Sequence, residues 1–400
     1  MKVNFWILLL IIFYSCGDNN VYSVIDTLPK QDSTDVCNLE NVEAYRVAYT
    51  TWKDSSSIRY FIEYIPIISQ DGTKIVDYFN RADKKYISDI TKKVSEESGK
   101  IIEKKIYEVY NKEEANVIFK FKIFEDDGVG GNLALSSFPP TKNQYGKPTI
   151  SFDLADMYKY VKERDKAAHT YERVFRHEAT HLYFGLFHDI ENGVSNPSKK
   201  YNSYQFDDIS GAKVNYKLFN DFIYNGVTYT FITKDNNKNI TNNFKVSEFY
   251  TKCTAPKYSV GHFISKNCIN GLQLIRDKYN TPIRVTSTFR NKTCNTIAGG
   301  ASESQHMHNN AIDWKFIGVK AGKAQLAYEK DVMSRSTFLQ KLLLSGIMGY
   351  GSYPGNFNHI DSRVISSGNR SLNGYKYIVW GEFAGSNAYY SSELEFKLHD

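Results

Sequence analysis

Alternation of apolar and polar residues predicts several strands in the first half of the chain. Residues 59–66 and 117–124 have the period of two that is typical of half-buried strands, and residues 133–135 form a short edge strand. Between the first two, residues 75–100 place apolar side chains at helical spacing, and residues 171–184 predict a second helix. A strand, helix, strand order that ends in such a helix indicates an α/β sandwich.

The length of the chain predicts two domains, because 400 residues exceed what one hydrophobic core usually organises. We place the first domain at 46–220 and the second at 246–400. Between them, residues 227–232 and 240–246 lie on either side of a turn-rich segment. This pattern predicts that 221–245 is a linker or a hairpin that bridges the two units.

The N-terminus has the pattern of an export signal. Lys2 precedes an unbroken apolar run over residues 5–14, which is the length of a signal core and too short to span a bilayer as a helix. Ser15-Cys16-Gly17 follows, and this arrangement resembles the lipobox of bacterial lipoproteins, in which the cysteine becomes lipidated. We therefore expect residues 1–16 to be a lipoprotein signal peptide, lipidated at Cys16, and the polar residues 17–45 to be a flexible tether.

The alternative is an ordinary secretory signal with an incidental cysteine. In both cases the chain leaves the cytoplasm. We expect it in the bacterial cell envelope, anchored by lipid to a membrane on either the periplasmic or the surface face. Alternatively, it is secreted.

The charge of the chain bears on its partners. The formal net charge of +6 is spread along the chain without a basic run, so no nucleic-acid partner is implied, whereas acidic cell-wall polymers would attract such a surface.

Four cysteines remain after Cys16, and an even number suits a disulfide-permissive compartment. Of Cys37, Cys253, Cys268 and Cys294, we expect Cys253 and Cys268 to pair.

The segment His177-Glu178-Ala-Thr-His181 has the residue types and the spacing of a zinc hydrolase site. Positions four apart share one face of a helix, so both imidazoles can bind one ion while Glu178 reaches the water on it. Zinc lowers the pKa of that water, and the glutamate takes its proton. The alternative is an amphipathic core helix with a polar outer face. Gly185 and His188, which follow at once, favour the metal site.

Together with residues 115–121, 128–139 and 207–211, this helix resembles the catalytic domain of matrixins, a branch of the metzincin proteases. The resemblance covers residues 52–216 and implies a zinc protease that acts on proteins or peptides, with calcium allowed in the same domain. It implies that an extended substrate pairs with the edge strand near Leu133. The implied zinc ligands are His177, His181 and His188, and the implied general base is Glu178.

Three features depart from the matrixin pattern. Three residues separate His181 from Gly185 where the family has two, so a simple continuation would turn the helix exit by about 100°. A π-bulge or an altered cap would absorb the extra residue. Residues 194–197 stand in the place of the family's Met-turn and contain no methionine. Leu135 stands where matrixins usually carry a histidine for a second, structural zinc, so we expect no such site. Cys37 stands about where matrixin prosegments carry a zinc-blocking thiolate, but a disulfide or an idle thiol is the favoured interpretation.

A second set of metal-binding residue types lies in the C-terminal half. His306, Asp313 and His359 come from separated points of the chain, and two histidines with one aspartate suit a catalytic zinc with one open position. With residues 282–290 and 299–313 they resemble the zinc D-Ala-D-Ala carboxypeptidases and murein endopeptidases, relatives of the Hedgehog fold. This resemblance implies these three residues as zinc ligands and stem peptides of peptidoglycan as the substrate.

The same resemblance assigns further residues of this site. Arg290 is implied as a clamp on a substrate carboxylate. Asn309 stands where the family usually has glycine, and asparagine also enters the left-handed region readily. The family's catalytic acid lies three residues before the last histidine, where this chain has Asn356. Asp361, on the same strand face as His359, is our candidate for the base or for a group that orients His359, and His308 is the alternative base.

We therefore expect an α/β (α+β) two-domain protein with one zinc ion per domain. A metzincin-like sandwich with an active-site helix precedes a Hedgehog-like, D-Ala-D-Ala peptidase-like α+β domain. In one alternative, only the first domain is catalytic and the second binds cell-wall peptides without cutting them. In another, the chain is a non-catalytic surface lipoprotein.

Overall fold

The computed structural model forms two compact units, which meet in the sequence between Leu218 and Phe219. The residues it describes are 51–52, 55–65, 67–68, 75–76, 78–124, 133–140, 146–162, 170–186, 194, 201–251, 261–353, 357–364, 370–372 and 375–381. Several predictions fall outside them, namely those on the signal peptide, the tether, Cys16, Cys37, His188, Cys253 and Asn356. No helix in the described ranges combines the length and the apolar character needed to cross a bilayer.

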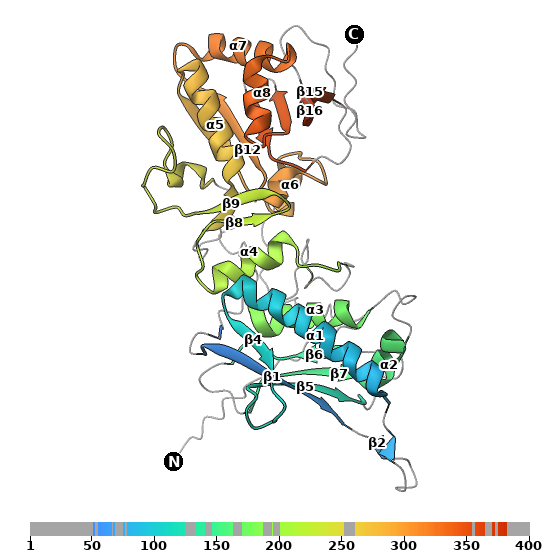
Figure 1. The fold of residues 1–400 in the computed structure, drawn as a ribbon. Helices are drawn as coiled ribbons and strands as arrows, with labels where there is room; N and C mark the ends of the chain where they lie inside the picture. Colours follow the sequence, from blue (N-terminus) through green and yellow to red (C-terminus); the bar gives the residue numbers. More distant parts are fainter. Residues whose placement is uncertain are drawn as a thin grey trace, which may run out of the picture. The chain divides into compact units, whose positions relative to one another are not determined.

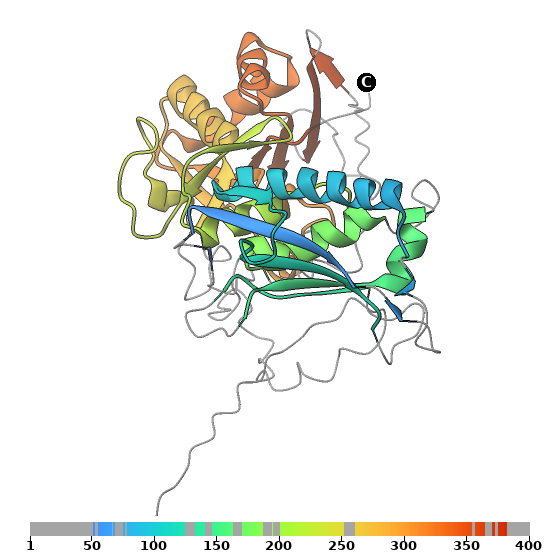
Figure 2. The same cartoon turned by 60° about the horizontal axis from the view of Figure 1, so that its bottom comes forward.

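A five-stranded sheet forms the centre of the first unit (Figures 1 and 2). Its order is β4 (Lys105–Glu108), β1 (Ser57–Tyr64), β5 (Val117–Lys122), β7 (Thr149–Asp153) and β6 (Ala134–Ser136). The first four strands are parallel, and β6 pairs antiparallel with β7 at one edge. A separate two-stranded ribbon joins β2 (Ile67–Ile68) to β3 (Ile75–Val76). The strands expected at 59–66, 117–124 and 133–135 are therefore present.

Helices α1 (Arg81–Ile102) and α3 (Tyr171–Ala179) pack against each other, and Phe175 of α3 lies against Phe119 and Phe152 of the sheet. Helix α1 begins later than the predicted residue 75 because Asn80 caps it. The Asn80 side chain accepts the N–H of Asp83 at 2.9 Å, and the Asp83 carboxylate accepts the N–H of Asn80 at 3.0 Å. The remaining helices of this unit are α2 (Leu154–Lys162) and α4 (Phe206–Asn215).

Three hydroxyl groups on one face of α1 satisfy three buried tyrosines. The residues are three or four positions apart, so they lie on the same side of the helix. Each pair of oxygens is 2.6–3.0 Å apart: Thr91 with Tyr171, Ser95 with Tyr183, and Ser98 with Tyr204. Because every member is buried, each tyrosine hydroxyl relies on its partner on α1 for a hydrogen bond.

Arg176 fixes the helix that carries the HExxH motif. Its side chain is only 1% exposed, pairs with Glu97 of α1 and with Glu172 one turn earlier, and lies over the ring of Tyr204 at 4.8 Å. A buried arginine is tolerated where carboxylates pair with its charge in this way. These contacts hold the part of α3 that carries the next residue, His177, against α1.

A six-stranded sheet forms the centre of the second unit (Figure 1). Its order is β11 (Ile283–Ser287), β12 (Ala311–Phe316), β14 (Phe357–Asp361), β13 (Gly349–Tyr353), β16 (Tyr375–Gly381) and β15 (Arg370–Leu372). Helices α5 (Lys266–Tyr279), α7 (Ala321–Met333) and α8 (Thr337–Leu344) share one hydrophobic core with it. Ile312, Tyr350 and Ile360 point into that core, so the alternate positions of the same strands face the other side.

The predicted hairpin is only partly correct. Strand β9 (Val227–Ile232) exists, but it pairs with β8 (Phe222–Tyr224) and with β10 (His262–Ser265) in a three-stranded sheet of the second unit. The two-residue turn is Asn225-Gly226, with φ of 47° and 78°, a combination typical of tight hairpins. Residues 240–246 form no strand. A single bridge pairs Asn239 with Lys245, and the 3-10 helix η3 (Val246–Phe249) follows.

The predicted disulfide between Cys253 and Cys268 is wrong, since Cys268 is a free, buried thiol. It lies on the inner face of α5, and its Sγ is 3.0 Å from the carbonyl oxygen of Asn310. Burial raises the pKa of this thiol to about 12, which keeps it protonated. Cys294 of α6 (Lys292–Ile297) is also free and buried.

The hydroxyl pairs on α1 give a direct test of this unit. Ser95→Ala or Tyr183→Phe alone leaves one buried hydroxyl without its partner, so each should lower the free energy of unfolding by about 1–3 kcal/mol. The double variant removes both groups and should cost less than the sum of the two single variants. Hydrogen exchange of the α1 amides in the full chain measures this, and strict additivity would show that the two hydroxyls do not interact.

Candidate metal sites

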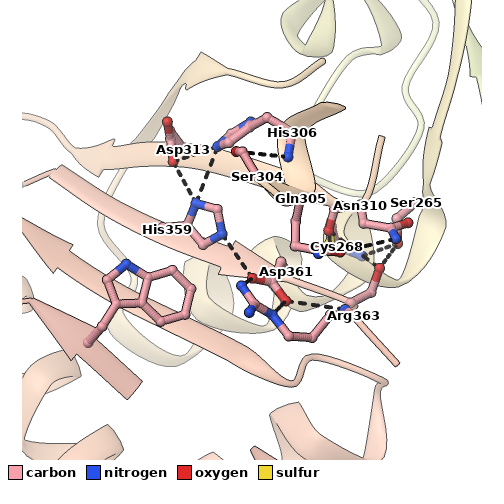
Figure 3. Close-up of polar contacts among 12 residues, drawn as sticks. Ser265, Cys268, Ser304, Gln305, His306, Asn310, Asp313, His359, Asp361 and Arg363 are labelled. Carbon is pink, nitrogen blue, oxygen red and sulfur yellow. Dashed lines mark hydrogen bonds and ion pairs between the residues drawn. The ribbon is translucent and has the colours of Figure 1, made fainter. Parts of the chain in front are cut away.

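Three ligand atoms meet on the face of the large sheet opposite its helices. Asp313 in β12 and His359 in β14 are directly opposite each other in the antiparallel pairing, and His306 belongs to the 3-10 helix η4 (Gln305–His308) just before β12. His306 Nε2 lies 3.0 Å from Asp313 Oδ1 and 3.2 Å from His359 Nδ1, and the latter two atoms are 2.8 Å apart (Figure 3). Within the described ranges, groups of three such side chains close enough to share an ion occur only here.

The geometry suits zinc. Ligands at 2.0–2.1 Å around a tetrahedral ion are about 3.3 Å apart, close to the separations of these three atoms. The two imidazole nitrogens and the carboxylate oxygen are a donor set that zinc accepts, and three protein ligands leave a fourth position for water or substrate.

Each imidazole is oriented by a hydrogen bond to its other nitrogen. Nδ1 of His306 donates to the carbonyl oxygen of Thr288, and Nε2 of His359 lies 3.0 Å from Asp361 Oδ2. With these nitrogens protonated, the lone pairs of His306 Nε2 and His359 Nδ1 point at the common centre. Both side chains are almost fully buried, so neither ring can turn freely toward water.

Electrostatics keeps the aspartate ligand charged. Burial alone would raise the pKa of Asp313, but the charges and hydrogen bonds of His306 and His359 hold it well below its usual value. Burial lowers the pKa of His306. Burial would also lower that of His359, but hydrogen bonds to Asp313 and Asp361 raise it. The carboxylate is therefore ionised, as a metal ligand must be.

Arg290 lies beside the metal ligands. Its Nη2 pairs with Asp313 Oδ2, the oxygen that does not face the histidines, and its Nε donates to Ser287 Oγ at 2.8 Å. The guanidinium that we predicted as a substrate clamp therefore also holds a ligand carboxylate. Asn309 has φ of 58° at the end of η4, so it adopts the left-handed conformation expected where the family has glycine.

Asp361 lies behind His359 (Figure 3). Its side chain is 0% exposed and contacts His359 Nε2 on one side and Arg363 on the other, where Arg363 Nε donates to Oδ1 at 2.8 Å. A catalytic base must reach the metal-bound water, which would lie on the Nδ1 side of His359. The sequence left two roles open for Asp361, that of the base and that of a group that orients His359. The geometry favours the second.

The first unit brings together two of its three predicted ligands. Nε2 of His177 and Nε2 of His181 are 3.3 Å apart. Nδ1 of His177 is 2.9 Å from the carbonyl oxygen of Val194, and Nδ1 of His181 is 2.6 Å from that of Leu186. Each imidazole thus donates its Nδ1 proton to the main chain and turns an Nε2 lone pair toward the other ring, as two ligands of one ion would.

A π-helix, η2 (Thr180–Phe184), carries His181 and absorbs the extra residue before the glycine. Gly185 ends it with φ of 66°, and its N–H bonds to the carbonyl of His181. Of the π-bulge and the altered cap that the spacing left open, the structure contains the π-bulge. Glu178 is 1% exposed in the preceding turn, and Ser136 of the edge strand β6 donates to its carbonyl oxygen at 3.1 Å.

Two groups that orient the histidines escaped the sequence reasoning. The carboxylate of Asp208, at the start of α4, accepts the N–H of Val194 at 2.9 Å and therefore holds the carbonyl that orients His177. In the sequence, Asp207 and Asp208 carried only the family resemblance and gave no sign of a contact with Val194. Arg363 could have been suspected from the alternation 359, 361, 363, which continues the spacing of one strand face two residues past the end of β14.

Comparison with known proteins identifies the domain around the second site. The family model described as Peptidase M15 matches residues 242–341, a stretch that contains His306 and Asp313 and ends before His359. A search of curated proteins returned no match to the chain. The second unit therefore contains a Peptidase M15 domain, which is a metallopeptidase domain with a His, Asp, His set. The match does not reach the first unit, so its matrixin-like character stays a prediction.

Proposed function

We propose that the Peptidase M15 domain of this protein is a zinc peptidase that hydrolyses peptide bonds in the stem peptides of peptidoglycan. The observation that supports it most is the triangle of His306 Nε2, Asp313 Oδ1 and His359 Nδ1, with sides of 2.8–3.2 Å. The Thr288 carbonyl and the Asp361 carboxylate accept from the imidazole nitrogens that face away from the triangle, which favours the tautomers that a metal requires. The chain needs no rearrangement at these residues to bind an ion.

The residues around the triangle have distinct tasks. Zinc, when bound, lowers the pKa of a coordinated water and polarises the scissile carbonyl. Arg290 uses Nε and Nη2 for Ser287 and Asp313, and we assign its remaining N–H donors to a carboxylate of the stem peptide, as the family resemblance implies. Because Asp361 is enclosed behind His359, His308 is the candidate that remains for the proton acceptor.

We propose a second activity for the first unit, that of a matrixin-like metallopeptidase. It is supported by the paired Nε2 atoms of His177 and His181 and by the main-chain carbonyls behind them. In this proposal His188 is the third zinc ligand and Glu178 the general base. Strand β6 is the antiparallel edge strand of this sheet, and in this proposal an extended protein or peptide substrate pairs with its outer edge. Calcium remains an expectation of the resemblance alone, since among the described residues a candidate metal group of three side chains occurs only in the second unit.

The proposed site of action is the bacterial cell envelope. Residues 5–14 have the length of a signal core, and Cys16 stands where a lipid anchor would be attached. A chain lipidated at Cys16 would be tethered to the membrane by residues 17–45 with both units free to reach the wall. A signal without lipidation would instead release the same two units.

The two sites can be tested against each other in the full chain. We expect two zinc ions in the parent protein and one after His306→Ala or His359→Ala, because two ligands cannot hold the ion in the second unit. These variants should lose release of stem-peptide fragments from purified peptidoglycan. Glu178→Ala, which leaves the second unit intact, is the matched control and should keep it. Equal release by the parent and by His359→Ala would show that this site only binds wall peptides or has no role.

The first unit has the converse test. Glu178→Ala should lower casein cleavage by about 10²–10⁴-fold, because the water then lacks its proton acceptor. Zinc content should not change, since Glu178 is not a ligand in this proposal. Here His359→Ala is the control and should cleave casein like the parent. Unimpaired cleavage by Glu178→Ala would remove the matrixin-like assignment.

A further inference from the structure

The second-unit metal site has a closed ring of contacts behind one of its ligands. His359 Nε2 contacts Asp361, and Arg363 holds both oxygens of Asp361 through Nε and Nη2 (Figure 3). The Arg363 guanidinium lies over the Trp380 ring at 5.1 Å. The Trp380 ring returns to the imidazole of His359, with centroids 4.9 Å apart and planes at 53°. Each of the four side chains therefore touches the next, and the last touches the first.

The pairing of neighbouring strands brings members of this ring of contacts into one row of the sheet. Asp313, His359, Gly351 and Trp380 are paired positions on four neighbouring strands, β12, β14, β13 and β16, so they form one row across the sheet. His359 and Trp380 lie two strands apart, which separates their backbones by about 10 Å. Their rings meet only because the strand between them carries a glycine in that row.

Two glycines of β13 leave the space that the ring occupies. A Cβ atom on Gly351 would be 2.7 Å from Nε1 of Trp380 and 3.1 Å from Cβ of His359. A Cβ atom on Gly349, which is paired with Asp361, would overlap the Asp361 carboxylate. Any larger residue at either position would displace a member of the ring.

We propose that Arg363 and Trp380 are positioning residues of the metal site, which hold Asp361 and His359 in the one arrangement that presents His359 Nδ1 to the ion. Asp361 accepts the Nε2 proton and so selects the tautomer with a free lone pair on Nδ1. The fork of Arg363 fixes both carboxylate oxygens, and the Trp380 ring packs against the imidazole so that it cannot rotate. This inference rests on the proposed zinc site and names residues outside the matched stretch 242–341.

A purely structural role for the ring makes a different prediction. Asp361 is buried and Arg363 partly buried, with side chains 0% and 18% exposed, and the pair could serve only to stabilise the strand end. In that case its removal would lower the unfolding temperature without changing the affinity for zinc or the protonation of His359. The positioning role predicts changes in both.

The test uses the full chain with His177→Ala and His181→Ala, so that only the second site binds zinc. In this background we would make Trp380→Leu, Gly351→Ala, and Asp361→Asn combined with Arg363→Met, which removes both buried charges together. Arg284→Met is the matched control, because Arg284 is an exposed arginine of β11. Competition with a chromophoric chelator gives the zinc affinity, and ¹⁵N spectra of the histidines in the metal-free protein give the tautomer of His359.

We expect the three ring variants to bind zinc about 10–100-fold more weakly than the background, and the control to be unchanged. His359 should be protonated on Nε2 in the background and mixed in the Asp361→Asn, Arg363→Met variant. Trp380→Phe keeps an aromatic ring, so it should fold and lose less affinity than Trp380→Leu. The inference would be overturned if the folded ring variants bound zinc as tightly as the background protein and kept the same tautomer of His359. If the background protein itself binds no zinc, the proposed function fails, and this inference with it.

Discussion

The antiparallel register of β12 against β14 is the constraint on which the second site depends. It sets Asp313 directly opposite His359, so two ligands from distant parts of the chain become neighbours on one sheet face. A slip of one residue would turn one ligand to the other face. Ile312 and Ile360, directly paired in the same register, bury their side chains in the core and prevent that slip. The hydrophobic core thus fixes the positions of the metal ligands from the opposite side of the sheet.

Both units orient a histidine by the same means, although their folds differ. In each, an imidazole that faces a second histidine gives its other N–H to a fixed acceptor. The first unit uses the carbonyls of Val194 and Leu186, and Asp208 in turn holds Val194. The second unit uses the carbonyl of Thr288 and the carboxylate of Asp361. Such acceptors settle which nitrogen can bind a metal before any metal arrives.

Local features of the sequence could be predicted well. The spacing of His177 and His181 placed both on one helix face. One extra residue before Gly185 left a π-bulge or an altered cap open, and the structure contains the π-helix. The His, Asp, His set of the second unit was visible from residue types and order, and the structure brings the three together. These successes depend on periodicity over a few residues or on a family motif, both of which can be read along the chain.

Features that depend on pairing between distant segments could not be predicted. Trp380 reaches His359 through the parallel pairing of β13 with β16, and no local pattern marks that contact. The expected disulfide failed because parity of cysteines says nothing of which face of α5 carries Cys268. The hairpin was misplaced because β8 is only three residues long, too short to show a strand pattern, although Asn225-Gly226 after it is a strong turn signal.

The most direct test of the account is anomalous diffraction at the zinc edge from crystals of the full chain. The account predicts a peak at about 2.0–2.2 Å from His306 Nε2, Asp313 Oδ1 and His359 Nδ1, with Asp361 still bound to Nε2 of His359. The absence of a peak there in zinc-loaded crystals, or coordination of His359 through Nε2, would contradict it.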